Sequence, residues 1–95
     1  MIKLYLFIYN DAVGTRQEIK AIINSMTTVI SWRFDIPHSF YITSNNSAIE
    51  IHDEFIASNG KKGRFMFVEC TDNRQGLMLK DTWYFLNNKK PVPKS

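Results

Sequence analysis

Residues 3–11 read KLYLFIYND and alternate without a break between two sets of apolar side chains. One set is aliphatic and the other aromatic: Leu4, Leu6 and Ile8 against Tyr5, Phe7 and Tyr9. Such alternation is typical of a β-strand, because successive side chains of a strand point to opposite faces of its sheet. Since both faces are apolar, we expect this strand to lie at the centre of a sheet that is covered on both sides.

Two capping boxes mark the starts of two amphipathic helices. Thr15 is followed three residues later by Glu18, and Ser47 is followed by Glu50. In a capping box the two side chains satisfy backbone N–H groups that the first helical turn leaves unpaired. Apolar residues then recur at helical spacing after each box, which predicts helices that end near residues 26 and 59.

Three further segments favour strands, and one favours a terminal helix. Residues 29–34 and 39–43 flank the turn sequence DIPH at 35–38 and predict a hairpin, while residues 64–70 predict a last strand. Apolar residues in 77–88 are spaced as in a short helix. The order predicts an α+β, ferredoxin-like βαββαβ fold, with an antiparallel sheet, two helices on one face and an extra C-terminal helix.

Composition indicates one domain, which we place at 1–88, followed by a flexible basic tail at 89–95 that contains two prolines. Cys70 is the only cysteine, so no internal disulfide can form, and the usual ligand spacing of structural zinc is absent. We therefore expect a cytoplasmic protein without a cofactor. The apolar start is too short for the roughly 20 residues of a membrane span, so no membrane partner is expected.

Positive charge is concentrated in the second part of the chain. Residues 1–60 carry four Lys and Arg against six Asp and Glu, whereas residues 61–95 carry eight against three. This asymmetry favours contact with an anion such as RNA or DNA, although a solubilising surface explains it as well. The candidate nucleic-acid-binding side chains are Lys61, Lys62, Arg64, Lys89 and Lys90.

Several short motifs together resemble one protein family. They read YND at 9–11, WRF at 32–34, SFYIT at 39–43, SAIEI at 47–51 and GLMLKDTW at 76–83. In this combination the chain resembles the SinR-like family of small bacterial proteins, which is similar in fold to the small CRISPR-associated adaptation protein and to VapD-type ribonucleases. The resemblance implies a ferredoxin-like homodimer. In the nuclease-like relatives the first strand ends in an acid where this chain has Asn10, one position before Asp11.

Asp11 is the candidate catalytic residue if the protein is a nuclease. Two copies in a twofold dimer would hold Mg²⁺, which prefers oxygen ligands, and a metal-activated water would attack a phosphodiester. Asp11 equally suits a structural role, in which it bonds loop amides ahead of the first helix.

The other titratable candidates are His38 in the predicted turn, His52 on the second helix and Cys70 at the end of the last strand. Either histidine is chemically suited to act as a general base, but both are also typical solvated surface residues. Cys70 has no obvious cationic neighbour in the sequence, which favours an inert thiol over a nucleophile.

The aromatic row of Tyr5, Phe7 and Tyr9 has two interpretations. Aromatic side chains on central strands stack bases in RNA-recognition sheets. Alternatively, the row is buried against the terminal helix, through Trp83 and Phe85, or against a second subunit, because two helices cover only one sheet face. We favour burial.

Three functional hypotheses follow from these patterns. The leading one is a homodimeric accessory protein that binds nucleic acid. The second is a divalent-metal-dependent nuclease that uses Asp11, and the third is a protein–protein interaction module of a phage or mobile element.

Overall fold

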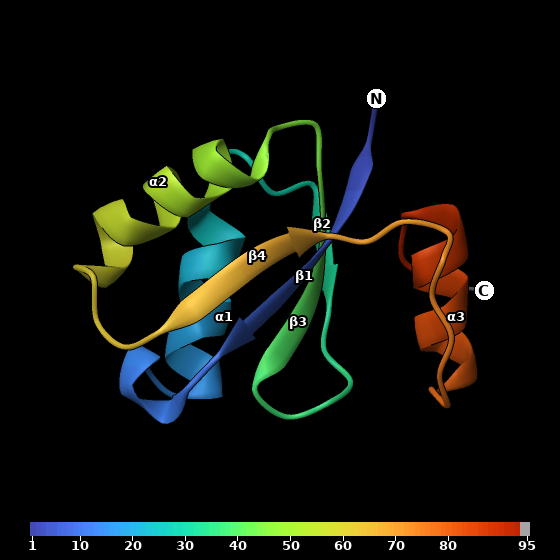
Figure 1. Cartoon of the computed structure of the whole chain (residues 1–95), viewed down its shortest axis with the longest axis horizontal. Coiled ribbons are helices and arrows are strands. Elements are labelled where there is room, and N and C mark those ends of the chain that lie inside the picture. Colours follow the sequence, from blue (N-terminus) through green and yellow to red (C-terminus); the bar gives the residue numbers. More distant parts are fainter. Residues whose placement is uncertain (94–95) are drawn as a thin grey trace.

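β1 (Lys3–Tyr9) lies at the centre of a four-stranded antiparallel sheet in the computed structural model, which describes residues 1–93 (Figure 1). The strand order is β2-β3-β1-β4, with β2 at Ser31–Arg33, β3 at Ser39–Ser44 and β4 at Phe65–Glu69. β1 pairs with β3 on one side and with β4 on the other. The predicted central position of the first strand is therefore confirmed.

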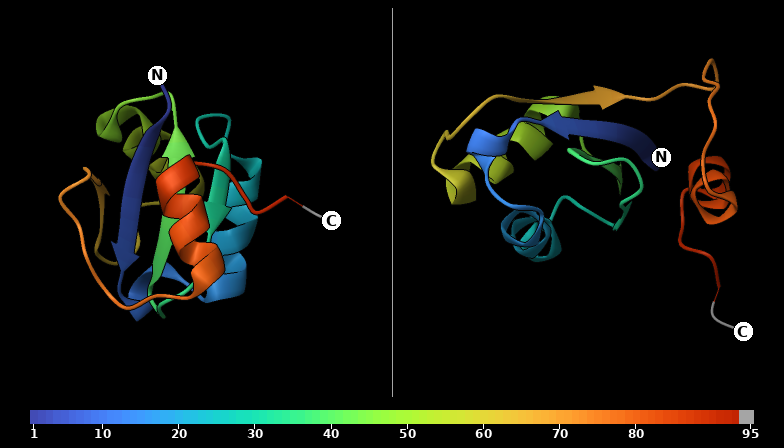
Figure 2. Two further views of the ribbon diagram at one scale, coloured as in Figure 1. Left: turned by 90° about the vertical axis from the view of Figure 1, so that its right-hand side faces the viewer. Right: turned by 90° about the horizontal axis from the view of Figure 1, so that it is seen from below.

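The helices lie on both faces of this sheet. α1 (Arg16–Ser25) and α2 (Ala48–Asn59) cover one face, and α3 (Lys80–Asn88) lies on the opposite face (Figure 2). A single 3₁₀ turn, η1 (Asp11–Val13), connects β1 to α1. This arrangement is the ferredoxin-like fold with an additional C-terminal helix, as the sequence predicts.

Both predicted capping boxes are present. Glu18 N donates to Thr15 Oγ1 at 3.1 Å, and Thr15 N donates to Glu18 Oε1 at 2.9 Å. The corresponding pair of bonds joins Ser47 and Glu50 at the start of α2. These local bonds fix where each helix begins, and hence how its apolar stripe meets the sheet.

The aromatic row of β1 faces α1 and α2, so the prediction that the terminal helix covers it was wrong. Tyr5 and Phe7 are at most 1% exposed and share a cluster with residues of both helices, against which Tyr9 also packs. Phe85 of α3 instead joins Leu4 of the aliphatic row in a separate, smaller cluster, against which Trp83 packs. Both rows are apolar, so alternation alone could not assign each row to its helix.

α3 is held to the sheet by a polar contact as well as by this cluster. Asp35, in the turn after β2, accepts hydrogen bonds from Thr82 Oγ1 at 2.5 Å and from Leu79 N at 3.4 Å. These bonds hold the backbone N–H of Leu79, the N-cap residue of α3, and the hydroxyl of Thr82 in its first turn. They also explain why the helix begins at Lys80 and not at residue 77 as predicted.

One other boundary differs from the sequence expectation. β2 is only three residues long, although alternation runs from 29 to 34. Of the predicted tail at 89–95, residues 94 and 95 lie outside the described residues. Within residues 1–93, no helix has both the length and the apolar character needed to cross a membrane.

A carboxylate on α2 ties that helix to the segment that follows α1. Glu54 accepts hydrogen bonds from the backbone N–H and the hydroxyl of both Thr27 and Thr28, at 2.6 to 2.9 Å. Partial burial opposes ionisation of Glu54, but the four bonds outweigh it and hold the pKa at about 2, against an ordinary value of 4.5.

Replacing this carboxylate tests its role in stability. Glu54→Gln should lower the free energy of unfolding at pH 7 by about 1–3 kcal/mol, because hydrogen bonds to a charged group are lost. The lowered pKa means that the unfolded state binds more protons between pH 4.5 and about 2. The wild-type advantage should therefore be complete above pH 4.5 and shrink as the pH falls to about 2. Urea unfolding across this range measures both effects.

Glu69→Gln is the matched control, because Glu69 is an exposed glutamate at the end of β4 whose carboxylate accepts no hydrogen bond within residues 1–93. An equal loss of stability in the two variants, or a Glu54→Gln effect that persists at pH 2, would contradict the proposed clamp.

Candidate functional site

Asp11 and His38, which the sequence presents as separate candidates, meet at the end of β1. His38 Nε2 lies 2.5 Å from Asp11 Oδ1, although the two residues are 27 positions apart in the chain. Both side chains face solvent: Asp11 is 94% exposed and His38 is 53% exposed. The pair is therefore accessible to a ligand, and an exposed ion pair of this kind contributes less than about 1 kcal/mol to stability.

The sheet register creates this meeting. β1 and β3 run antiparallel with Ile8 opposite Ser39, so the residues that follow β1 lie beside those that precede β3. Tyr9 N donates to His38 O at 3.1 Å, and the two rings lie 5.6 Å apart between centroids. His38 has a φ of 65°, in the left-handed region that few non-glycine residues occupy.

A hollow of about 360 Å³ opens beside the pair. Its wall includes Asp11, His38, Tyr9, Phe34 and Arg16. The Arg16 guanidinium lies 4.4 Å from the centroid of the Phe34 ring, which orients the cation at the N-terminal end of α1. Burial raises the pKa of the Tyr9 hydroxyl, the charge of Arg16 opposes this rise, and Asp11 adds to it. The hollow thus combines an aromatic wall with a cation and an ion pair.

The loop between α2 and β4 docks against η1 (Figures 1 and 2). Asn10 N donates to Arg64 O, and Arg64 N donates to Asn10 Oδ1, both at 3.1 Å. Within the loop, Asn59 Nδ2 donates to Lys62 O at 3.0 Å. The charge of Lys62 also contributes to the lowered pKa of Glu18 in the first turn of α1, after the two Thr15 hydrogen bonds.

Cations from three separate segments therefore gather at one edge of the molecule. We call this surface the basic edge and define it by five residues: Arg16, His38, Lys61, Lys62 and Arg64. Lys89 and Lys90 are not part of it, because they follow the last turn of α3, and α3 lies at the opposite end of the long axis (Figure 1). The five predicted nucleic-acid-binding residues therefore form two separate groups, one in the loop at 61–64 and one after α3.

The same loop engages Asn10, the residue that follows β1. Asn10 uses its side chain to hold Arg64 N, while Asp11 projects into solvent. Among residues 1–93, no three His, Cys, Asp or Glu side chains come close enough to hold a metal ion. One exposed carboxylate that already contacts His38 does not make a Mg²⁺ site by itself, so a metal-dependent route would need the carboxylate of a second copy.

Neither of the two remaining titratable candidates lines the hollow beside Asp11 and His38. His52 lies on α2, where its Nδ1 is 3.0 Å from Asp53 Oδ1. Cys70 is half-buried beside α3, and burial raises the pKa of its thiol, which favours the neutral, unreactive form. The expectation that Cys70 has no cationic neighbour was wrong, because the charge of Arg74 acts on it and opposes the rise.

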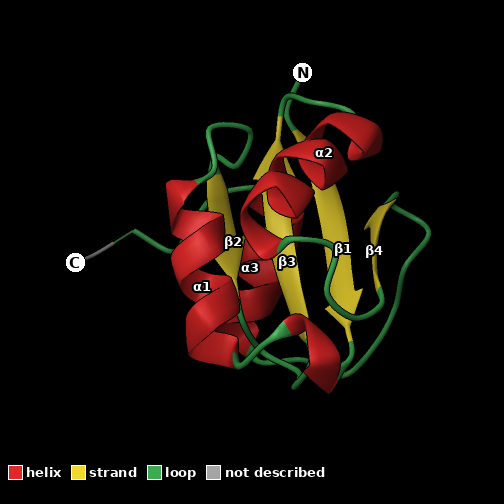
Figure 3. Cartoon of the chain, turned by 90° about the vertical axis from the view of Figure 1, so that its left-hand side faces the viewer, coloured by secondary structure: helices red, strands yellow, loops and turns green. Residues whose placement is uncertain are grey.

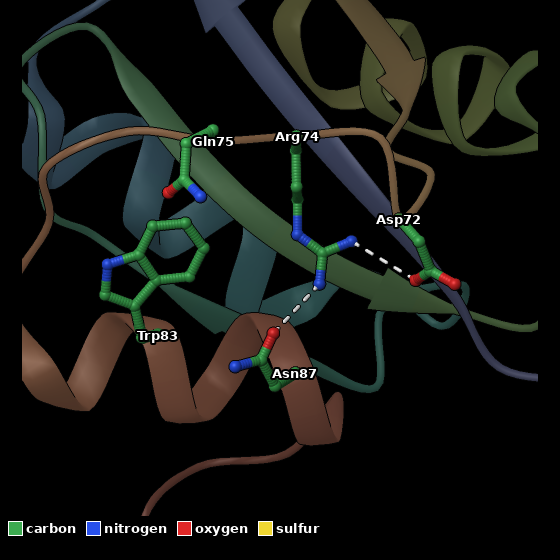
Figure 4. Close-up of a pocket in the computed structure, with 5 residues that line it drawn as sticks. All are labelled: Asp72, Arg74, Gln75, Trp83 and Asn87. Atoms are coloured by element: carbon green, nitrogen blue, oxygen red, sulfur yellow. Dashed lines mark hydrogen bonds and ion pairs between the residues drawn. The ribbon is translucent and has the colours of Figure 1, made fainter.

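A larger hollow, of about 510 Å³, separates α3 from the segment that follows β4. Figure 4 shows Arg74 reaching across it toward Asn87, with Asp72 on one side and Trp83 on the other. The Arg74 guanidinium donates to Thr71 O at 2.6 Å and to Leu86 O at 3.0 Å. These bonds occupy the cation in attaching α3, so this hollow is a structural junction and not the candidate site.

The aromatic row is not available for base stacking. Tyr5, Phe7 and Phe40 are each at most 1% exposed beneath α1 and α2. Sequence reasoning also missed Arg16 and Phe34 as wall residues of the hollow at the Asp11–His38 pair, because their contact joins an α1 residue to the end of a hairpin strand. The Asp11–His38 meeting, by contrast, follows from the predicted topology, in which the first and third strands are antiparallel neighbours.

Gly63 is the residue that permits the loop to dock on η1. It has a φ of 71°, and a Cβ atom at this position would lie 2.5 Å from Val13 N and 2.7 Å from Val13 Cγ2. Gly63→Ala should therefore lower the free energy of unfolding through both backbone strain, about 1–2 kcal/mol, and overpacking, about 1–3 kcal/mol. Chemical denaturation measures the sum.

Gly60→Ala is the control that has the backbone strain without the steric clash. Gly60 has nearly the same φ, 70°, but a Cβ atom there would meet nothing within 4 Å. We expect Gly60→Ala to lower stability by the backbone term alone, clearly less than Gly63→Ala. Equal destabilisation by the two substitutions would show that the loop does not pack on η1 as described.

Comparison with known proteins adds no relative to this picture. No protein-family model, no curated protein and no solved structure matches the chain. The SinR-like resemblance therefore stays a prediction, and the functional proposal below rests on the geometry of the molecule.

Proposed function

We propose that this protein binds single-stranded nucleic acid along the basic edge. The observation that carries the proposal is the docking of the loop between α2 and β4 on η1, which places Lys61, Lys62 and Arg64 at the end of the sheet where Arg16 and His38 also lie. Each of these side chains is exposed and can meet a phosphate without a change in the fold. A row of cations supplies most of the affinity for a nucleic-acid backbone.

The hollow in the basic edge favours a single strand over a duplex. A cavity of about 360 Å³ is in the usual size range of small-molecule sites and suits one nucleotide. Tyr9 and Phe34 form the aromatic part of the wall of this hollow, and Arg16 lies over the Phe34 ring, where its guanidinium can meet a phosphate. A base must be unstacked from its neighbours to enter such a hollow, which costs least in a single strand.

Fluorescence anisotropy with a short labelled single-stranded RNA tests this proposal. The variant with Lys61→Ala, Lys62→Ala and Arg64→Ala should bind more weakly at low salt. The plot of the logarithm of the association constant against the logarithm of the salt concentration should become less steep by about 2. Each lost phosphate contact reduces the magnitude of this slope by about 0.7 for a single strand. The control is Lys89→Ala with Lys90→Ala, which removes two cations outside the basic edge and should leave the slope nearly unchanged.

Two results would contradict the proposal. One is an equal loss of affinity in the control variant, which would move the contact to α3. The other is the absence of binding to RNA or DNA at low salt, which would favour a protein–protein interaction module instead.

We further propose that the protein acts as a homodimer, with the second copy on the sheet face that α3 leaves open. α3 lies over the β2–β3 side of the sheet and leaves β4, an edge strand, uncovered (Figure 3). On this open side Ile8, Met66 and Val68 are 42%, 57% and 43% exposed, and Ile8 pairs directly with Met66. Contiguous exposed apolar residues along an unpaired edge strand are typical of an interface.

Light scattering at micromolar concentration tests the dimer. Wild type should have about twice the 11.1 kDa mass of one chain, and Met66→Lys should shift it toward the monomer. Ile49→Lys is the control, because Ile49 is 62% exposed on α2, on the other side of the sheet. A monomeric wild type, or equal dissociation of both variants, would argue against this interface.

A further inference from the structure

We propose that the Asp11–His38 pair cleaves RNA bound at the basic edge, with His38 as general base and without a metal ion. The products would be a 2′,3′-cyclic phosphate and a 5′-hydroxyl end. This inference rests on the proposed binding of a single strand, and it adds a reaction and a substrate requirement, the ribose 2′-hydroxyl.

The orientation of His38 suits a general base. Its Nε2 is taken by Asp11 Oδ1, so a neutral imidazole donates its proton there and keeps the lone pair on Nδ1. Nδ1 makes no hydrogen bond within residues 1–93, and the side chain is about half exposed. A carboxylate that fixes the tautomer of a histidine, and stabilises the imidazolium that forms, is a recurring arrangement in general-base catalysis.

The backbone holds His38 in an unusual conformation. Its φ of 65° lies in the left-handed region, at a cost of about 1–3 kcal/mol of the kind that clusters at functional sites. The hydrogen bond from Tyr9 N to His38 O anchors the backbone here, and the ring contacts Asp11. An exposed contact such as that between His38 and Asp11 returns too little stability to offset that cost.

Arg16 is the group placed to meet the reacting phosphate. It lines the same hollow as Asp11 and His38, and its stacking on Phe34 limits the positions of the guanidinium. A guanidinium presents two parallel N–H donors to phosphate oxygens and strengthens its contact as negative charge builds up on them. His38 and Arg16 therefore approach a bound nucleotide from two sides of one hollow.

The reaction is balanced with these groups and water. His38 Nδ1 accepts the proton of the ribose 2′-hydroxyl while the 2′-oxygen forms a bond to phosphorus. The bond from phosphorus to the 5′-oxygen then breaks, and the leaving 5′-oxygen takes a proton from water. The imidazolium returns its proton to solvent. No electron acceptor, electron donor or co-substrate is needed.

The matched control for this pair lies on α2. His52 contacts Asp53 as His38 contacts Asp11, at 3.0 Å, and is similarly exposed, but it does not line the hollow. The test uses a labelled uridine-rich RNA and the same sequence with every 2′-hydroxyl replaced by hydrogen, both in EDTA. Binding is measured by anisotropy on the same samples, and cleavage is measured by electrophoresis. The chemistry of the new ends is identified by whether phosphatase removes the phosphate before and after acid treatment.

We expect wild type and His52→Gln to cut the RNA strand, to leave the 2′-deoxy strand intact and to produce cyclic phosphate ends. His38→Gln should lower kcat about 100-fold or more, the usual contribution of general-base catalysis. Asp11→Asn, which removes a positioning residue, should lower kcat by less. Both variants should keep the thermal unfolding temperature of wild type, and any change in KM should be small beside the change in kcat.

Wild-type protein that binds the RNA in EDTA and does not cut it would overturn this inference and leave the proposed binding function in place. Cutting of the 2′-deoxy strand would also overturn the inference. Cutting only with Mg²⁺ would overturn it in favour of a metal-dependent route at Asp11. Equal activity of His38→Gln and wild type would show that His38 is not responsible for the cleavage. Failure to bind either strand would contradict the proposed function itself.

Discussion

The structure depends on the burial of both faces of β1. Tyr5 and Phe7 point into the cluster beneath α1 and α2, and Leu4 points into the cluster beneath α3, all at most 1% exposed. Full burial of each such side chain contributes about 1.5–3 kcal/mol. Because β1 also pairs with a strand on each side, its position fixes the register of β3 and β4 and the side on which each helix must lie.

The candidate site is a consequence of that central position. Where β1 ends, the chain turns through η1, and the start of β3 and the start of β4 lie on either side. Three segments that are distant in the chain therefore lie at this end of the sheet. They are the segment with Asp11 and Arg16, the turn with His38, and the loop with Lys61 and Lys62. Asn10 and Gly63 act as structural supports, since one bonds the loop and the other gives it room.

The sequence predicted the elements whose signals come from residues that are close together in the chain. Alternation located β1, and the Thr15 and Ser47 boxes located α1 and α2, because these signals involve residues that are neighbours in the chain. The side on which α3 packs was missed, because both rows of β1 are apolar and the sequence does not reveal that Asp35 bonds Leu79, 44 residues away. For the site, Asp11 and His38 were both recognised, but their contact and the place of Arg16 emerge only from the tertiary structure.

Chemical shift mapping tests the central claim, that the basic edge is the surface that binds nucleic acid. Backbone amide signals of isotope-labelled protein would be followed during titration with a short single-stranded RNA. The structure predicts that the largest shifts fall on η1, the first turn of α1, the turn before β3 and the loop between α2 and β4. Shifts centred on α3 and Lys89, or no shifts at low salt, would contradict the claim.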